Sequence, residues 1–192
     1  MELTVSELNE CLNKWEEALK KAMLPEWNEL PEISLYMDQV LILMNKYLSL
    51  YCDNGNSDKI ITASIINNYV KMKVIPSPQK KKYSKIHLIY LIMVCILKQC
   101  LSISTIKTLI PLDLQEKKLK SFYEIFRKNE KEIAEEIVTK IKAITSKSEE
   151  NDELLINEII IKSALKANAF KYFTERIAEI NAHSPETKDK DK

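Results

Sequence analysis

The sequence predicts a mainly helical protein, and three observations support this prediction. Only one of the 192 residues is glycine, Gly55, although tight turns, strand bulges and phosphate-binding loops depend on glycine. Apolar residues recur every three or four positions in several segments, which is the periodicity of a helix with one buried face. Prolines and short polar stretches separate these segments and mark where helices end.

The first two helices are expected within residues 1–51. Thr4 and Glu7 have the spacing of a capping box, so a helix should begin at Thr4. Its apolar face would consist of Leu8, Leu12, Trp15 and Leu19. Pro25 and Pro31 interrupt the chain before a second helix at about residues 34–51. The residues expected to be buried on that helix are Leu35, Val40, Leu41, Leu43, Met44, Tyr47 and Leu48. The polar stretch CDNGNSD then forms a loop.

Five further helices follow. A short helix should begin at Thr62, a good N-cap residue, and end before the segment IPSP. The next two are expected after Ser84, reaching Cys100, and in the segment SISTIKTLI. Two long helices at about 113–145 and 152–181 complete the chain, and the polar residues 184–192 should be disordered. This gives an N-terminal helix and linker (1–33), a central domain (34–112), a C-terminal helical hairpin or dimerisation region (113–183) and a tail (184–192).

Several classes of function have little support. The apolar run at residues 86–97 has twelve residues, whereas a membrane-spanning helix needs about 20, so a buried core helix is expected. The acidic, amphipathic start MELTVSELNE does not resemble a signal peptide, which predicts a cytoplasmic protein with reduced cysteines. The cysteines lack metal-ligand spacing, and neither His87 nor His183 belongs to a catalytic pattern. We therefore expect no metal, no cofactor and no enzymatic activity.

Charge is distributed unevenly along the chain. Residues 59–112 contain nine lysines and no Asp or Glu. Because the whole chain carries a net charge of +1, the remainder carries −8. Such asymmetry indicates a segment that faces a polyanion.

The expected helix at residues 62–73 separates into two faces. Its inner face would comprise Ile61, Ile65, Ile66, Tyr69 and Val70, and its outer stripe Ser64, Asn67, Asn68 and Lys71. An exposed Asn can make a bidentate contact with adenine in the major groove. The hydroxyls of Thr62 and Ser64 would lie at the helix N-terminus, which favours phosphate. Lys80, Lys81 and Lys82 follow on a proline-stiffened turn and could hold phosphates. A solvated face, RNA or an acidic partner are the alternatives.

The order of these segments resembles the winged helix-turn-helix head of MerR-type bacterial transcription regulators. Residues 67–70 stand at the R-Y-Y-E positions of that family, and Val74, Ile75 and Pro76 match its L-(I/L)-P. Lys81 and Tyr83 stand at the Arg and Tyr of its basic wing. The family has glycine where this chain has Lys73, so Lys73 would have to end the helix at positive φ. The resemblance implies a winged helix-turn-helix with a short wing at residues 34–112, plus additional N- and C-terminal helices.

A second resemblance covers roughly residues 30–112. The segments LPEISLYMDQV, INNYVK and KKKYS are similar to a bacterial family that carries a domain-of-unknown-function label. This implies a bacterial protein with a MerR-like DNA-binding domain and no established ligand.

The two C-terminal helices could pair within one subunit or between two. The stripe on the first consists of Leu119, Phe122, Phe126, Ile133, Ile137, Ile141 and Ile144. The second, between Leu154 and Ile180, is apolar on more than one face and needs partners on both sides. Either other helices of the same subunit or a second subunit could supply them. We expect a homodimer, and a small-molecule effector bound by these helices is a further expectation.

The sequence therefore predicts a DNA-binding transcription regulator that reads duplex DNA with helix 62–73 and a lysine-rich wing at 79–85. The residues expected to contact DNA are Thr62, Ser64, Asn67, Asn68, Lys71, Lys80, Lys81, Lys82, Tyr83 and Lys85. The alternative is a non-enzymatic helical interaction module whose basic patch docks an acidic partner.

Overall fold

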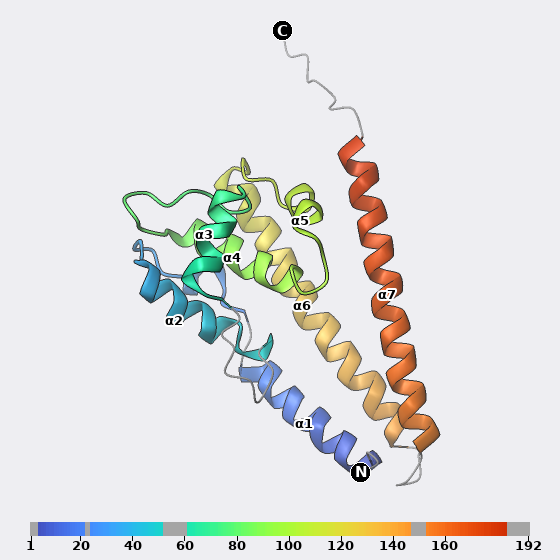
Figure 1. The fold of residues 1–192 in the computed structure, drawn as a ribbon. Coiled ribbons are helices and arrows are strands. Elements are labelled where there is room, and N and C mark those ends of the chain that lie inside the picture. Colours follow the sequence, from blue (N-terminus) through green and yellow to red (C-terminus); the bar gives the residue numbers. More distant parts are fainter. Residues whose placement is uncertain (1–3, 22–23, 52–60, 147–152, 184–192) are drawn as a thin grey trace.

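The computed structural model describes residues 4–21, 24–51, 61–146 and 153–183. This part of the chain is mainly helical and contains isolated β-bridges but no strand, so the helical prediction is confirmed (Figure 1). In chain order the elements are α1 (Val5–Lys21), the 3-10 helix η1 (Trp27–Glu29), α2 (Met37–Tyr47), the 3-10 helix η2 (Ser49–Tyr51), α3 (Ala63–Lys71), α4 (Lys85–Leu97), α5 (Ile103–Leu109), α6 (Glu116–Thr145) and α7 (Glu153–His183). The loop expected at 52–58 and the tail expected at 184–192 lie outside the described residues.

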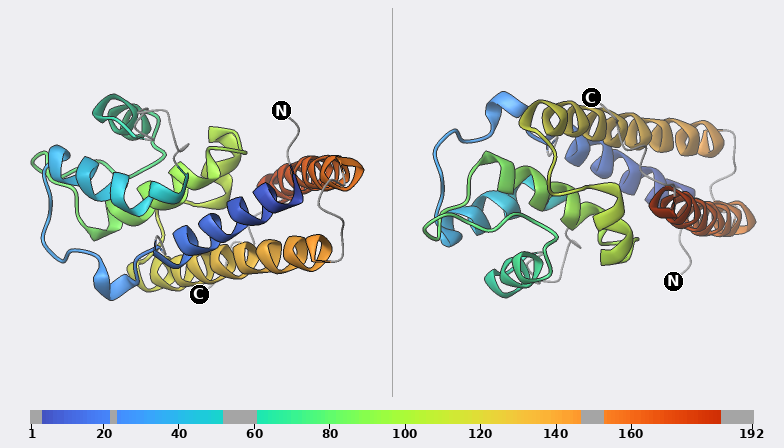
Figure 2. Two further views of the ribbon diagram at one scale, coloured as in Figure 1. Left: turned by 90° about the horizontal axis from the view of Figure 1, so that it is seen from below. Right: turned by 90° about the horizontal axis from the view of Figure 1, so that it is seen from above.

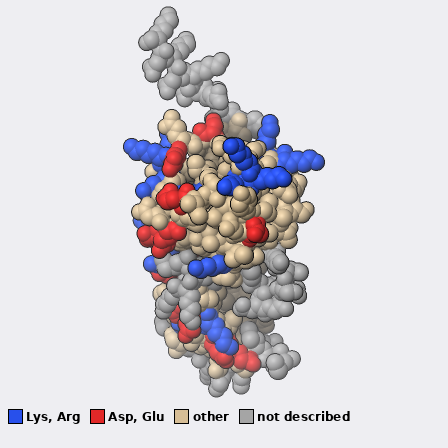
Figure 3. Space-filling view, turned by 90° about the vertical axis from the view of Figure 1, so that its left-hand side faces the viewer, with Lys and Arg blue, Asp and Glu red and all other residues tan. Residues whose placement is uncertain are grey.

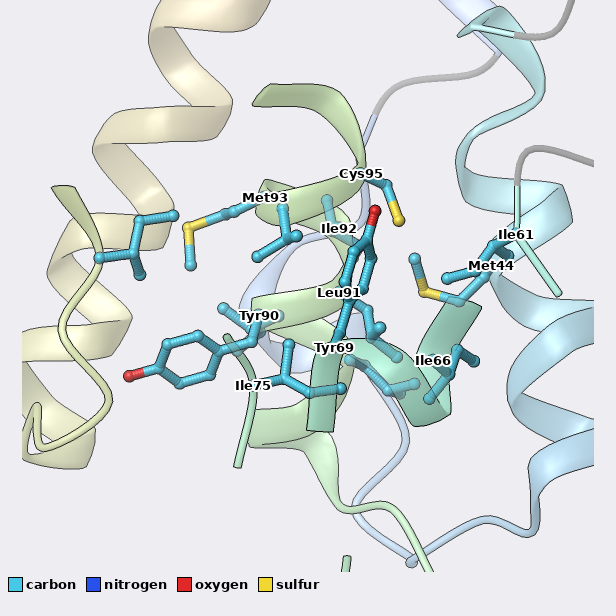
Figure 4. Close-up of a cluster of buried hydrophobic side chains, with 14 of the residues drawn as sticks. Met44, Ile61, Ile66, Tyr69, Ile75, Tyr90, Leu91, Ile92, Met93 and Cys95 are labelled. Carbon is cyan, nitrogen blue, oxygen red and sulfur yellow. The ribbon is translucent and has the colours of Figure 1, made fainter. Parts of the chain in front are cut away.

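Helix α4 forms the centre of the core. Every residue from Leu88 to Cys95 is buried, and Figure 4 shows α3 and α2 contributing Ile66, Tyr69 and Met44 to the same cluster. A fully buried large apolar side chain contributes roughly 1.5–3 kcal/mol, so this helix dominates the packing. The prediction of a buried core helix is confirmed. Among the described helices, none combines the length and the apolar character needed to cross a bilayer.

Helix α1 lies alongside α6, away from this core (Figures 1 and 2). The predicted capping box is present, because the Thr4 backbone N–H donates to Glu7 Oε2 at 2.8 Å and the Glu7 N–H donates to Thr4 Oγ1 at 3.2 Å. At the other end of the pair, the Tyr123 hydroxyl donates to the Pro25 carbonyl at 2.8 Å. Between the two helices themselves, Lys142 forms an ion pair with Glu16 and the Thr145 hydroxyl donates to Asn9 Oδ1 at 2.7 Å. The contacts with α6 thus attach the N-terminal helix to the long helix that leaves the core.

Some helix ends differ from the sequence prediction. Helix α2 begins at Met37 rather than at Ser34, because Leu35 exchanges two backbone hydrogen bonds of 2.8 Å with Tyr83. Helix α4 ends at Leu97, before Cys100, and α6 begins at Glu116 instead of residue 113. The predicted start of α3 after Thr62 is confirmed.

Helix α7 packs against α5 (Figure 1). Ile156 and Ala178 are its buried residues, whereas every residue from Ile160 to Phe173 is exposed. Over that stretch, other described helices of the same chain do not enclose α7 on both sides.

Candidate nucleic-acid interface

Helix α3 has the two faces that its sequence predicts. Ile61, Ile66 and Tyr69 are buried, and Ile65 and Val70 are half-buried against the core. The Thr62 side chain accepts a hydrogen bond of 3.3 Å from the Ile65 N–H. This hydroxyl is therefore occupied as the N-cap of the helix, which fixes where α3 begins.

The opposite face of α3 is polar and open to solvent. Its residues Ser64, Asn67, Asn68 and Lys71 are all exposed, and their spacing places them on one stripe. Asparagine is a mediocre helix former, so the two central residues contribute little to the stability of α3 while presenting two carboxamides. Such a face can offer donors and acceptors to base edges.

Helix α3 ends at a lysine in the left-handed region. The Val74 N–H donates to the Tyr69 carbonyl at 2.8 Å and the Lys73 N–H to the Val70 carbonyl at 3.0 Å, which together form a Schellman motif. Lys73 has φ of 53°. The expectation that Lys73 ends the helix at positive φ is confirmed.

A tight turn at residues 79–82, here called the lysine turn, follows α3. The Gln79 N–H donates to the Lys82 carbonyl at 3.1 Å, and the Lys82 N–H donates to the Gln79 carbonyl at 2.9 Å. Lys80 and Lys81 have φ of 50° and 62°, as in a two-residue type I′ hairpin turn. That turn normally carries Asn-Gly, yet here two exposed lysines form its tip. The turn therefore presents adjacent ammonium groups at a conformational cost.

Both ends of the lysine turn are fixed to the core. Tyr83 is buried and pairs with Leu35. His87 Nδ1 accepts from the Ser84 N–H at 3.0 Å, and His87 Nε2 lies 3.2 Å from the Ser77 carbonyl and donates to it. Burial lowers the pKa of His87, partly offset by that second hydrogen bond. The neutral imidazole thus connects the chain before the turn to the first turn of α4.

Lys85 and Tyr83 do not belong to the exposed surface. The side chain of Lys85 is 9% exposed; its ammonium forms an ion pair with Glu32 and lies 5.4 Å from the centroid of the Trp27 ring. Tyr83 is 3% exposed. These two residues, expected from the sequence to contact DNA, are instead buried against the segment before α2: Lys85 contacts Trp27 and Glu32, and Tyr83 pairs with Leu35.

The structure adds Tyr36 to the surface. Lys82 Nζ lies 5.0 Å from the centroid of the half-exposed Tyr36 ring, within the range of a cation–π contact. The two residues are 46 positions apart, so no local pattern could have indicated the contact. Figure 3 views the side of the molecule that carries the lysine turn and shows basic side chains extending from its upper half, with acidic side chains beside them.

A separate cavity of about 410 Å³ lies between α1, α4 and α6. Its lining is mostly apolar and includes Trp15, Ile96 and Phe126. The lining carboxylate of Glu130 accepts a hydrogen bond of 2.6 Å from the Tyr51 hydroxyl, and burial raises the pKa of Tyr51. A lining of this kind suits a small apolar ligand.

Comparison with known proteins gives one match. Residues 25–126 match the model of a family described as Domain of unknown function (DUF1836). That segment covers the core around α4 together with α3 and the lysine turn. No curated protein and no solved structure matches the chain.

Proposed function

We propose that this chain, which belongs to the DUF1836 family, binds duplex DNA as a transcription regulator. In this proposal α3 lies in the major groove, as the second helix of a MerR-like winged helix-turn-helix. The lysine turn would act as its short wing and contact the phosphate backbone. The exposed stripe Ser64, Asn67, Asn68 and Lys71 would face the base edges.

The lysine turn is the observation that supports the proposal most strongly. Its two tip lysines are held at positive φ, where each non-glycine residue costs about 1–2 kcal/mol relative to an ordinary conformation. Strained conformations of this kind concentrate at functional sites. An exposed turn with no other constraint on sequence would be more stable with Asn-Gly. The retained lysines favour a role for their charge.

The position of the turn supports a joint interface with α3. The Schellman motif at Lys73 ends α3 abruptly, and only residues 74–78 separate it from the turn. His87 and Tyr83 then hold the turn to the core. Here the helix proposed to contact bases and the turn proposed to contact phosphates are fixed to one core. They can dock onto DNA together without the ordering of a flexible arm, which limits the entropy lost on binding.

The competing proposal is a protein-interaction module whose lysines dock an acidic partner. Both proposals rely on positive charge, so sensitivity to salt does not separate them. A preference for one duplex over others does, because base readout produces such a preference and generic charge attraction does not.

The decisive experiment is selection of duplexes from a random library by the purified protein, followed by anisotropy titrations on the enriched sequence. A specific regulator should bind that sequence at least about a thousandfold more tightly than random duplex. The double substitution Asn67→Ala and Asn68→Ala should remove most of this preference while leaving binding to random duplex nearly unchanged. Lys117→Ala with Lys118→Ala, two exposed lysines on α6, serves as the control. Absence of enrichment would refute base readout and favour the acidic partner.

A further inference from the structure

Helix α7 is exposed on all sides over four turns. Each of the fourteen residues 160–173 is exposed. Isolated helices of this length are marginal in water, and most helical stability in proteins comes from packing an apolar face. The sequence of this stretch is nevertheless rich in large apolar residues, among them Ile161, Leu165 and Phe173. A packing partner for α7 is therefore required.

The apolar surface of α7 is large enough for a stable interface. Its exposed large apolar residues are Leu154, Ile160, Ile161, Leu165, Phe170, Tyr172, Phe173, Ile177 and Ile180. A fully exposed large side chain presents about 200 Å². Multiplied by the exposed fractions of these residues, this gives about 1,100 Å² of apolar surface, summed over all sides of the helix. The four of them that share one line along the helix, Leu154, Ile161, Leu165 and Tyr172, contribute about 550 Å². A standard interface buries about 800 Å² on each partner, of which about 65% is apolar in homodimers, so these four residues supply about the apolar area that one partner needs.

Four of these residues form a single outward stripe. Leu154, Ile161, Leu165 and Tyr172 are spaced by seven, four and seven positions, which places them on one line along the helix. Their exposed fractions are 83%, 58%, 63% and 70%. The buried residues Ile156 and Ala178 lie on a different side of the helix, where α7 meets its own chain.

The spacing of this stripe is the same when read in either direction. Consider an antiparallel pair whose centre lies midway between Ile161 and Leu165. In this pair, Ile161 of one copy faces Leu165 of the other. In the same register Leu154 faces Tyr172, so every large apolar residue of the stripe meets another. We propose that a second copy of this chain covers the stripe, with the two α7 helices packed antiparallel.

Acidic residues along the same line favour the antiparallel arrangement. A parallel, in-register pair would set Glu158, Glu175 and Glu179 each against its own copy, and like charges in contact are destabilising. In the antiparallel pair, Glu158 faces Asn168, whose carboxamide can donate to the carboxylate. The helices overlap over residues 153–173, so Glu175 and Glu179 lie beyond the contact.

This inference does not depend on the DNA-binding proposal. Figure 1 shows α7 on the side of the molecule away from α2 and from the loop that joins α3 to α4. Pairing through α7 therefore leaves α3 and the lysine turn accessible, and it gives the assembly two copies of that surface. Dimerisation can be measured without DNA, so the two proposals can fail separately.

The first test is sedimentation velocity of the full chain without DNA, over a range of about 1–100 μM, because the weakest interfaces of standard size have micromolar affinity. The chain should sediment as a dimer. The double variant Ile161→Glu and Leu165→Glu should sediment as a monomer at every concentration and keep its helical circular dichroism signal. Ile42→Glu, at an isoleucine on α2 that is even more exposed (72%), is the control and should remain dimeric. A monomeric wild type, or a dimer unaffected by the double variant, overturns the proposal.

The second test measures helix orientation. A spin label is attached at Asn181→Cys, with Cys11, Cys52 and Cys100 replaced by Ser, while the buried Cys95 stays unreactive. Residue 181 lies eighteen positions from the centre of the pair, so antiparallel helices separate the two labels by about 54 Å along the axis. Pulsed dipolar spectroscopy should report a distance near that value. Labels closer than about 20 Å would instead show parallel helices and overturn the proposed arrangement.

Discussion

Replacing Lys80 by Asn and Lys81 by Gly should stabilise the fold and weaken DNA binding at the same time. The two lysines have φ of 50° and 62°, and a left-handed conformation costs an L-residue other than Gly or Asn about 1–2 kcal/mol. Asn-Gly is the preferred pair for this turn. Glycine offsets roughly 0.5–1 kcal/mol of this stabilisation, because it increases the conformational entropy of the unfolded chain. Because both residues are relieved, the free energy of unfolding should rise by about 1–3 kcal/mol in the double variant.

The expected loss of DNA affinity follows from the exposure of both lysines to solvent. Each phosphate contact that is lost should reduce the slope of log K against log salt by about 0.9, hence by about 2 for both residues. Affinity should fall for all duplexes alike, because phosphate contacts carry no sequence information.

Two assays on the same preparations test the prediction. Thermal unfolding followed by circular dichroism should show Tm higher by roughly 2–12 °C for a chain of this size. Anisotropy titrations between about 50 and 200 mM salt should show the flatter slope. The double variant Lys98→Ala and Lys107→Ala removes the same charge from two exposed positions outside the turn, and both measurements should change little. A lower Tm for the Asn-Gly variant would refute the argument from strain, and an unchanged salt slope would refute the phosphate contacts.

Three further predictions concern residues near the turn. His87 is neutral and accepts a hydrogen bond from the Ser84 N–H, and burial lowers its pKa. Its contribution to the free energy of unfolding is therefore complete above the unfolded pKa of about 6.5. That contribution is lost as the pH falls through the lower folded pKa. Denaturant titrations between about pH 7 and 5 should therefore show that lowering the pH reduces the free energy of unfolding more for the wild type than for His87→Gln. Lys73→Gly, at φ of 53°, should raise the midpoint of urea unfolding by an amount equivalent to about 1 kcal/mol; a decrease would contradict the Schellman geometry. Lys85→Met should leave the salt slope of DNA binding unchanged, because Lys85 is buried, and should alter the free energy of unfolding by at most about 1 kcal/mol, since its partner Glu32 is 80% exposed and can be solvated. A salt slope that fell as it does in the turn variant would show that Lys85 reaches phosphate.

Local signals in the sequence were sufficient for most of the helices. The capping box of Thr4 and Glu7, the N-cap Thr62 and the prolines that follow each act within one or two helical turns. The two faces of α3 follow from helical periodicity alone, which is why Ile66 and Asn67 lie on opposite sides as expected.

The supports of the lysine turn could not be predicted, because they come from distant parts of the chain. The Leu35–Tyr83 bridge and the Lys85–Glu32 ion pair join residues 48 and 53 positions apart. Within a run of lysines, nothing local distinguishes a residue that will be buried by Trp27 from its neighbours that remain in solvent. That distinction arises only in the folded structure. Among the lysines expected to contact DNA, Lys85 is buried and the others are exposed.

Lysine occupies all the non-glycine positions of positive φ in the described residues, and the three positions, Lys73, Lys80 and Lys81, fall within nine consecutive residues. Helix termination and a two-residue hairpin would each be more stable with Gly or Asn. Asparagine is common in this chain and already stands at Asn67 and Asn68 nearby, so a shortage of suitable residues does not explain the choice. The strain therefore accompanies a requirement for charge at these positions. In the proposed DNA-binding role, phosphate contact would provide that requirement at Lys80 and Lys81, and the exposed side chain of Lys73, at the end of α3, extends the same positive surface toward the helix.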